Sequence, residues 1–284
     1  MRRGVPSAPA RTLLIVASTW GALAAPAAGQ EREPPAVRLP QALSPSVPPA
    51  WQVADSLFMA GDLLGAWGVT QARLDVADDD ARTRVRAVQI ALALGIMGGG
   101  PPVRLRWLRA ADEQGRLLLA LRPSDPEAMA WAAASRGKLA LAEDGSRTAV
   151  RLAEETWRLS GDLLAIAPGH PLGNDVRGKL HHEAKRLSTF KRFVGRVFLG
   201  FDLAGEASWA DAETHLRRAV EGSPAMLHFH LDLGDMYRDQ GKTEEALAAY
   251  REGLARPDSL PVDAHLKLIL RQRIEEIRPA PGGG

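Results

Sequence analysis

The chain contains no cysteine among its 284 residues. That absence excludes disulfide bonds, a thiolate nucleophile, iron–sulfur clusters and zinc held by cysteine. Net charge is nearly absent as well, because 36 lysines and arginines stand against 34 aspartates and glutamates. Without Arg2, Arg3 and Arg11, which lie in an expected leader, 33 basic residues face 34 acidic ones, a net charge of −1. Net charge therefore gives no support to nucleic-acid binding, and we expect no nucleic-acid partner.

Residues 1–29 have the pattern of a secretory signal peptide. A basic start precedes an apolar stretch at 12–25, and small residues follow up to Gly29. Cleavage before Gln30 would release an exported chain, and export without cysteine favours a bacterial periplasm. The alternative is an uncleaved membrane anchor. Polar and helix-breaking residues interrupt the apolar stretch, however, and it is shorter than the roughly 20 residues that a membrane span needs.

Two further segments are expected to lie outside the folded domain. Residues 30–50 contain six prolines, which favour extended backbone and predict a Pro-rich linker. Residues 278–284 are rich in proline and glycine and are expected to form a disordered tail. Between them, residues 51–277 are rich in the good helix formers Ala, Leu, Arg and Glu. Short loops with Gly and Pro divide this region into helical pieces, which predicts antiparallel neighbours.

Internal repeats predict the fold. Within 227–258, the positions that the tetratricopeptide repeat (TPR) prescribes are matched, at or within one residue, by Leu233, Gly234, Tyr237, Gly241, Ala246, Tyr250, Leu254 and Pro257. A shift back by 34 residues, the TPR period, predicts a second repeat at 193–226, with Gly200 in the place of Gly234. Glycine at this place is expected to let the two helices of a repeat approach closely.

Weaker repeats are expected upstream. Residues 55–62 resemble the end of a first helix and its turn, and 82–97 with 103–121 form the next expected pair. A final helix at 262–277 should cover the last repeat. We therefore predict an all-α, TPR-like, right-handed α-solenoid of about five to six helix pairs with a C-terminal capping helix.

The stretch 126–257 has a narrower resemblance. Trp131 with its small-residue helix, Gly178-Lys179-Leu180, and Ser208-Trp209 before Ala212 are similar to the TPR-like family of the regulators of microtubule dynamics, which has exported bacterial relatives. The resemblance implies an all-helical superhelix that engages proteins and has no catalytic activity. It does not imply a microtubule role for an exported bacterial chain.

Motifs for catalysis and metal binding fail on their spacing. Gly241-Lys242-Thr243 resembles the end of a phosphate loop, but Met236 stands where that loop needs a glycine. His182-Glu183 resembles the start of a zinc-protease helix, but Arg186 stands where the second histidine ligand belongs. We expect no cofactor, no metal site and no enzyme activity, while an active site assembled from distant residues stays open as an alternative.

A cluster of basic residues lies between positions 177 and 196, with phenylalanines interleaved and Glu183 as the single acid. This set, the basic patch, consists of Arg177, Lys179, Lys185, Arg186, Lys191, Arg192 and Arg196. One interpretation is a docking surface for an anionic partner or for lipid headgroups at a membrane. The other is an ordinary amphipathic helix pair with solvated charges, and the amphipathic spacing favours it.

The expected function is an exported, non-catalytic scaffold or adaptor that binds a protein or peptide along its concave surface, which the first helix of each pair lines. The expected contact residues are Phe201, His228, Leu231, Asp235, Arg238 and Asp239. The alternative is a carrier that encloses a small apolar or lipid ligand inside the superhelix, with the basic patch binding its acidic head.

Overall fold

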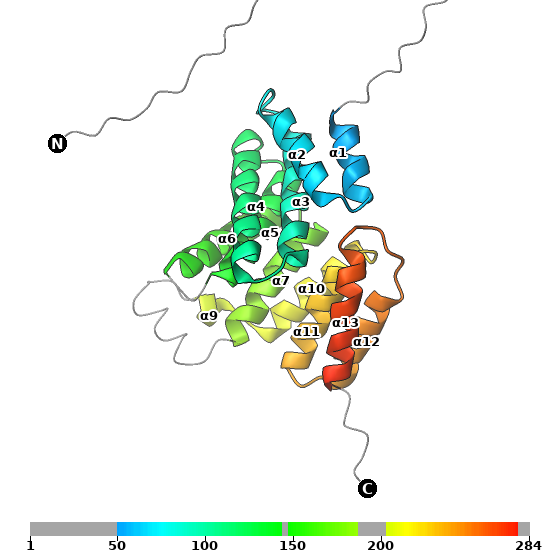
Figure 1. Ribbon diagram of the computed structural model, residues 1–284. Helices are drawn as coiled ribbons and strands as arrows, with labels where there is room; N and C mark the ends of the chain where they lie inside the picture. The colour runs from blue at the N-terminus through cyan, green and yellow to red at the C-terminus, as the bar shows by residue number, and fades with distance from the viewer. Residues whose placement is uncertain (1–49, 144–146, 187–202, 278–284) are drawn as a thin grey trace, which may run out of the picture. The chain divides into compact units, whose positions relative to one another are not determined.

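Helices follow one another in packed pairs (Figure 1). The computed structural model describes residues 50–143, 147–186 and 203–277, all within the unit formed by residues 47–284. The helices are α1 (Ala50–Met59), α2 (Leu63–Leu74), α3 (Ala81–Met97), α4 (Pro101–Leu121), α5 (Pro126–Ala142), α6 (Arg147–Ile166), α7 (Pro171–Arg186), α9 (Leu203–Glu206), α10 (Trp209–Gly222), α11 (Leu227–Asp239), α12 (Thr243–Leu254) and α13 (Asp263–Ile277). Among these helices, none combines the length and the hydrophobicity that a membrane span requires.

Turns and caps explain where the helices begin. Gly61 and Gly241 have φ angles of 83° and 76°, a backbone conformation that glycine adopts without strain. The side chains of Asp80 and Ser208 accept hydrogen bonds from the backbone N–H groups at the starts of α3 and α10. Gly241 therefore forms a turn between α11 and α12, as a repeat requires, rather than part of a phosphate loop.

Glycines allow the two helices of a pair to approach closely. A Cβ atom at Gly234 of α11 would overlap the ring of Tyr250 on α12, which confirms the role predicted for this glycine. In the preceding pair the corresponding glycine is Gly178 of α7, where a Cβ would lie 2.7 Å from Cγ of Leu216 on α10. The helix pair here is thus α7 with α10.

Of the repeat predicted at 193–226, the structure describes residues 203–226. The TPR spacing correctly places the second helix of that repeat, α10, but its packing partner is α7, and residues 187–208 come between them in the sequence. The first half of the predicted repeat lies mostly in residues 187–202, outside the described part of the chain. Gly200 and Phe201 lie outside the described residues.

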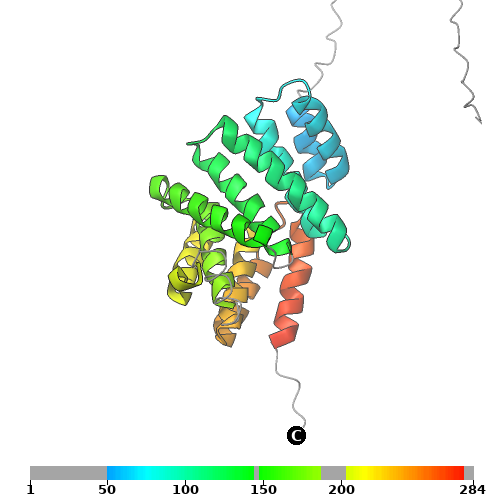
Figure 2. The same ribbon diagram turned by 90° about the vertical axis from the view of Figure 1, so that its left-hand side faces the viewer.

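The first helices of successive pairs form one continuous layer. α1 packs on α3, α3 on α5, α5 on α7, α7 on α11, and α11 on α13. We call these helices the inner layer, and α2, α4, α6, α10 and α12 the outer layer. Figure 2 shows the helices following one another from the first ones, in blue, at one end to the last ones, in orange and red, at the other. The described residues thus contain five helix pairs and α13, which buries Leu266 and Leu270 and leaves Leu268 60% exposed. These features confirm the predicted capping helix.

The loop before α13 joins the last pair to the first ones. Leu260 packs against the apolar cluster of α1 to α3 that contains Phe58 and Ile90, and against the cluster of Leu227 and Val262. Figure 1 shows this loop beside α3 and the end of α1. The carboxylate of Asp263, a buried residue, accepts the backbone N–H of Leu260 at 2.8 Å, which holds the loop in place.

Candidate partner-binding surface

Asp235, a predicted contact residue, is occupied by donors from its own chain. Its Oδ1 accepts the Tyr250 hydroxyl at 2.7 Å and the Nε of Arg273 at 3.0 Å. Arg238 adds a third contact at 3.1 Å. Burial and the charge of Asp235 raise the pKa of Tyr250, so the phenol stays protonated and donates. Asp235 therefore ties α11 to α12 and α13.

Asp239, at the end of α11, joins that helix to α7. It accepts Nε2–H of His182 at 2.9 Å and the Nε of Arg186 at 2.7 Å. Arg238 also donates to Asp239, at 3.1 Å. Burial, followed by the charge of Lys179, lowers the pKa of His182, which keeps the ring neutral. The polar atoms of Asp239 are thus used in holding α7 and α11 together.

A third set, the inner charge cluster, lies between α5, α7 and α11 and consists of Lys138, Asp175, Lys179, His228 and Asp232. Lys179 donates to Asp232 at 2.7 Å, and the Nζ of Lys138 lies 3.7 Å from the same carboxylate. Asp175 is buried, and its Oδ1 has no hydrogen-bond partner among the described residues. Burial, then the charge of Asp232, raises the pKa of Asp175 well above its usual range. Burial, then Lys138, lowers the pKa of His228 to about 4.

Leu231 completes the contact residues predicted on α11. It packs against the clusters around Tyr250 and around Leu227, beside the segment that leads into α13. The five predicted residues other than Phe201 all lie on α11, a helix of the inner layer. Their contacts within the chain were not predictable, because the partners of Asp235 and Asp239 come from α7, α12 and α13.

The described members of the basic patch do not form one exposed surface. The guanidinium of Arg177 lies 3.3 Å from the ring centroid of Trp157 and donates to its carbonyl oxygen. Lys179 contacts Asp232, and Arg186 pairs with Asp239. Arg177 and Lys179 are two residues apart on a helix and point about 200° apart, so they do not share one face of α7. Lys191, Arg192 and Arg196 lie outside the described residues.

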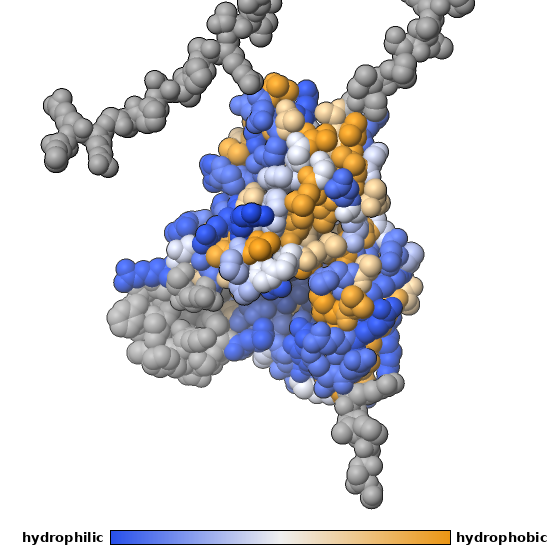
Figure 3. Space-filling model, viewed as in Figure 1, coloured by the Kyte–Doolittle hydropathy of each residue, from blue (hydrophilic) through white to orange (hydrophobic). Residues whose placement is uncertain are grey.

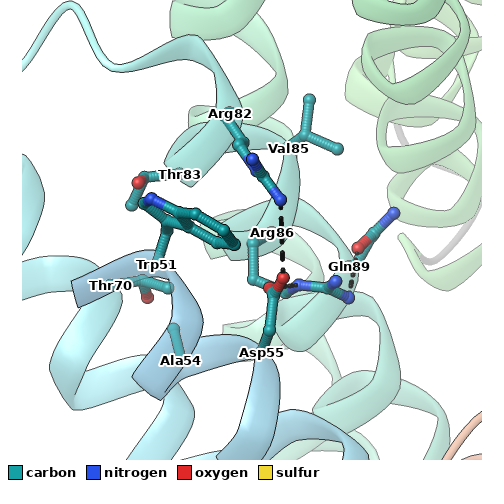
Figure 4. Close-up of a pocket in the computed structure, with 9 residues that line it drawn as sticks. All are labelled: Trp51, Ala54, Asp55, Thr70, Arg82, Thr83, Val85, Arg86 and Gln89. Atoms are coloured by element: carbon teal, nitrogen blue, oxygen red, sulfur yellow. Dashed lines mark hydrogen bonds and ion pairs between the residues drawn. The ribbon is translucent and has the colours of Figure 1, made fainter. Parts of the chain in front are cut away.

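An open pocket of about 220 Å³, not predicted from the sequence, lies between α1, α2 and α3 (Figure 4). It is lined by Trp51, Ala54, Asp55, Thr70, Arg82, Thr83, Val85, Arg86 and Gln89. We call it the Trp51 pocket. The spacing of Arg82, Arg86 and Gln89, which places them on one face of a helix, was the available signal. Trp51 gave none, because it directly follows the Pro-rich segment.

The two arginines of this pocket are held differently. Arg86 donates to Asp55 at 2.7 Å and to Gln89 at 2.7 Å. The guanidinium of Arg82 lies 3.7 Å from the ring centroid of Trp51, and its Nη2 is 3.9 Å from Asp55. Figure 4 shows Arg82 above the indole and both arginines directed toward Asp55. Two hydrogen bonds thus hold Arg86, whereas Arg82 is held mainly by stacking.

The surface of this end of the molecule mixes apolar and polar groups. Figure 3 shows hydrophobic side chains gathered over the upper part of the described chain, with hydrophilic ones around them.

Metal coordination finds no support in the described ranges, where no three histidine, aspartate or glutamate side chains form a group able to hold a metal ion. In the broken zinc motif, Nε2 of His182 lies 2.9 Å from Oδ2 of Asp239.

Paired helices that cross at a glycine and stack through their first helices define the TPR fold. A TPR protein of Thermus thermophilus, TTC0263, is 17% identical over 80% of this chain and 97% of its own, with a TM-score of 0.55. The chain therefore has the predicted all-α TPR solenoid fold. Two other solved structures are more distant. MamA from Desulfovibrio magneticus RS-1 is 14% identical over 72% of this chain and 91% of its own, with a TM-score of 0.40. YrrB, described as a TPR protein with an unusual peptide-binding site, is 12% identical over 78% of this chain and 90% of its own, with a TM-score of 0.38. No protein-family model matches the sequence, and none of the curated proteins is detectably similar to it.

Proposed function

We propose that the chain is an exported, non-catalytic scaffold that binds a protein or peptide partner along its inner layer. The observation that carries this proposal is the continuous layer formed by α1, α3, α5, α7, α11 and α13. A layer of this kind presents side chains from every repeat to one extended partner. Export to a bacterial periplasm is part of the proposal and rests on the leader pattern of residues 1–29.

The two halves of the inner layer differ in what they offer a partner. On α7, α11 and α13, the charged groups of Asp235, Asp239 and Lys179 are paired within the chain. A partner could bind these groups only if the existing pairs broke, at a cost in free energy. At α1 and α3 the Trp51 pocket is open. We therefore propose that the partner contacts the layer first at α1 and α3.

The carrier alternative receives less support. An enclosed apolar cavity is what a lipid or small apolar ligand needs. The Trp51 pocket is instead open and lined by three charged side chains, those of Asp55, Arg82 and Arg86. In the inner charge cluster, the pKa of Lys179 is raised and that of Asp232 is lowered because the two groups pair with each other. This pairing supports a structural role for them rather than a catalytic one.

Site-specific photo-crosslinking in the native host tests the proposal. A photoreactive residue at Val85, in the Trp51 pocket, should capture one or a few partners, which mass spectrometry identifies. The matched control carries the same residue at Arg251, an exposed position of the outer-layer helix α12, and should capture none of them. Equal capture at both positions, or none at Val85, would contradict the proposal. Native mass spectrometry that finds a bound lipid would favour the carrier instead.

N-terminal sequencing of the protein recovered from the host's periplasm tests the export part. A mature start at Gln30 is expected. A chain that retains Met1 in the membrane fraction would contradict cleavage and support the anchor.

A further inference from the structure

We propose that the Trp51 pocket binds the carboxylate of a glutamate side chain that belongs to an extended acidic peptide segment. This inference rests on the proposed function and specifies the chemistry of the partner. It follows from the charge, the preorganisation and the size of the pocket.

The pocket carries an uncompensated positive charge. Two arginines line it, but Asp55 is the single acidic residue among the lining side chains. The short contacts of Asp55 go to Arg86, at 2.7 Å. The 3.9 Å separation between Asp55 and the Nη2 of Arg82 is too long for a hydrogen bond. The guanidinium of Arg82, whose side chain is 64% exposed, therefore has donors available for a second carboxylate.

The donors are held in place before a ligand arrives. Stacking over Trp51 restricts the plane of the Arg82 guanidinium, and a planar guanidinium binds a carboxylate through two parallel N–H donors. Arg86 is held by Asp55 and Gln89 and lies 4.5 Å from the ring centroid of Phe58. Side chains that are already ordered lose little conformational entropy on binding, which favours affinity.

The size and walls of the pocket select a side chain rather than a folded surface. About 220 Å³ accommodates a carboxylate with its methylene groups but not a protein domain. Ala54, Val85 and the indole of Trp51 provide apolar walls for the methylenes of glutamate. The positive charge of Arg82 repels lysine and arginine side chains, so the same groups give specificity against basic segments.

Fluorescence anisotropy with the mature chain, residues 30–284, tests the inference. The probe is a fluorescein-labelled hexaglutamate peptide with an amidated C-terminus, so that side-chain carboxylates are its only acidic groups apart from the dye. The wild-type chain should bind it, and Arg82→Gln should weaken binding at least tenfold. Hexaglutamine and hexalysine peptides with the same label should not bind. Equal affinity for hexalysine, or an unchanged affinity in Arg82→Gln, would overturn the inference.

Arg106→Gln is the matched control. The guanidinium of Arg106 lies 4.9 Å from the ring centroid of Trp107 on α4, so the substitution removes the same charge from the same kind of stack outside the pocket. Its affinity for hexaglutamate should equal that of the wild type. A loss equal to that of Arg82→Gln would show binding by general charge and overturn the inference. Melting temperatures of both variants within a few degrees of the wild type show that they fold.

Two measurements separate this inference from the proposed function. Inorganic phosphate at the concentration of the peptide should not displace it, and displacement would reveal a site for small anions and overturn the peptide assignment. Photo-crosslinking at Val85 is repeated with Arg82→Gln. Partner capture at wild-type efficiency in that variant would overturn the role of the pocket while leaving the scaffold function standing. No capture by either chain, with hexaglutamate binding intact, would contradict the scaffold function alone.

Discussion

The ammonium group of Lys179 on α7 lies 2.7 Å from Oδ1 of Asp232 on α11. The two side chains are only 16% and 6% exposed, so the pair is largely shielded from water. Burial opposes the charge of both groups, yet the attraction between them raises the pKa of Lys179 and lowers that of Asp232. This contact crosses between two inner-layer helices that are not consecutive in the chain.

Breaking this pair should destabilise the protein strongly. Asp232→Asn removes the closer carboxylate and leaves the buried charge of Lys179 with only Glu183, 3.4 Å away, as an ion-pair partner. We expect a loss of about 3 kcal/mol in the free energy of unfolding. Urea denaturation measures it. Glu113→Gln is the control, because Glu113 and Arg116 are 2.8 Å apart but more than half exposed. That substitution should cost less than about 1 kcal/mol. Equal losses of unfolding free energy in the two variants would contradict the prediction that a buried ion pair stabilises the protein more than an exposed one.

Neutralising Asp175 should stabilise the protein at neutral pH. Burial raises the folded-state pKa of Asp175 above its unfolded value, so ionisation favours unfolding and stability falls as pH rises through the folded-state pKa. Asp175→Asn removes this penalty. We expect its melting temperature to exceed the wild-type value by about 2–4 °C at pH 8. The difference should shrink as the pH falls through the folded-state pKa and vanish below the unfolded pKa of about 3.9, where Asp175 is neutral in the folded and the unfolded chain. A lower melting temperature of the variant at pH 8 would contradict the prediction.

Acid should weaken the start of α10 through His181. The Nδ1 of His181 accepts the backbone N–H of Ser208 at 3.2 Å, which requires a neutral ring. Burial, then the charge of Arg177, lowers the pKa of His181 to about 4. Because this value lies below the unfolded pKa of about 6.5, the contribution to stability is complete above pH 6.5 and is lost as pH falls toward 4.

The expected loss from His181 alone is about 2 kcal/mol between pH 7.5 and pH 5. Urea denaturation of the wild type and of His181→Gln at both pH values measures it. The variant should be less stable at pH 7.5 but should lose less on acidification. An identical pH dependence in the two proteins would show that His181 does not carry the effect.

The helix crossing of the last repeat should not tolerate a methyl group. In Gly234→Ala the new Cβ meets the ring of Tyr250, and we expect a loss of about 1–3 kcal/mol from overpacking. Gly68→Ala in α2 is the matched control, since no atom lies within 4 Å of a Cβ built there. Alanine at that helical position should stabilise the protein by about 0.5–1 kcal/mol. Thermal denaturation should show a lower melting temperature for Gly234→Ala and a higher one for Gly68→Ala than for the wild type.

Leu260 should couple the first helix pairs to the last. Because it contacts the clusters around Phe58 and around Leu227, Leu260→Ser should cost about 1–3 kcal/mol. Hydrogen exchange should then become faster in α1 to α3 as well as in α13. Leu268→Ser, at an exposed position of α13, should change neither the free energy of unfolding nor the exchange rates. Faster exchange confined to α13 would contradict the coupling.

Most of the helices follow from the sequence because their signals are local. The pair at 82–97 and 103–121 and the turn at Gly61 depend on spacing of three and four residues, caps and a glycine with positive φ. The crossing of Gly234 and Tyr250 was equally predictable, since both residues lie within one TPR period and the glycine meets a side chain 16 positions away.

The pairing of α7 with α10 was not predictable in this way. The second helix carries the repeat signal, but its partner lies across an intervening segment, and periodicity does not reveal which earlier glycine it packs against. The tertiary contacts of the basic patch were equally unpredictable, because spacing along α7 shows only that the side chains of Arg177 and Lys179 point in different directions. It does not show that one meets Trp157 and the other Asp232.

The sequence by itself determined that this protein is a helical-repeat solenoid, because backbone geometry and close helix crossings impose local patterns on the residues. It also placed His228, Leu231, Asp235, Arg238 and Asp239 on one helix. Only the tertiary structure decided which polar groups on the inner layer are already paired and which, such as the guanidinium of Arg82, have donors available. Pairing and burial depend on helices distant in the sequence, and they set the free energy of binding a partner.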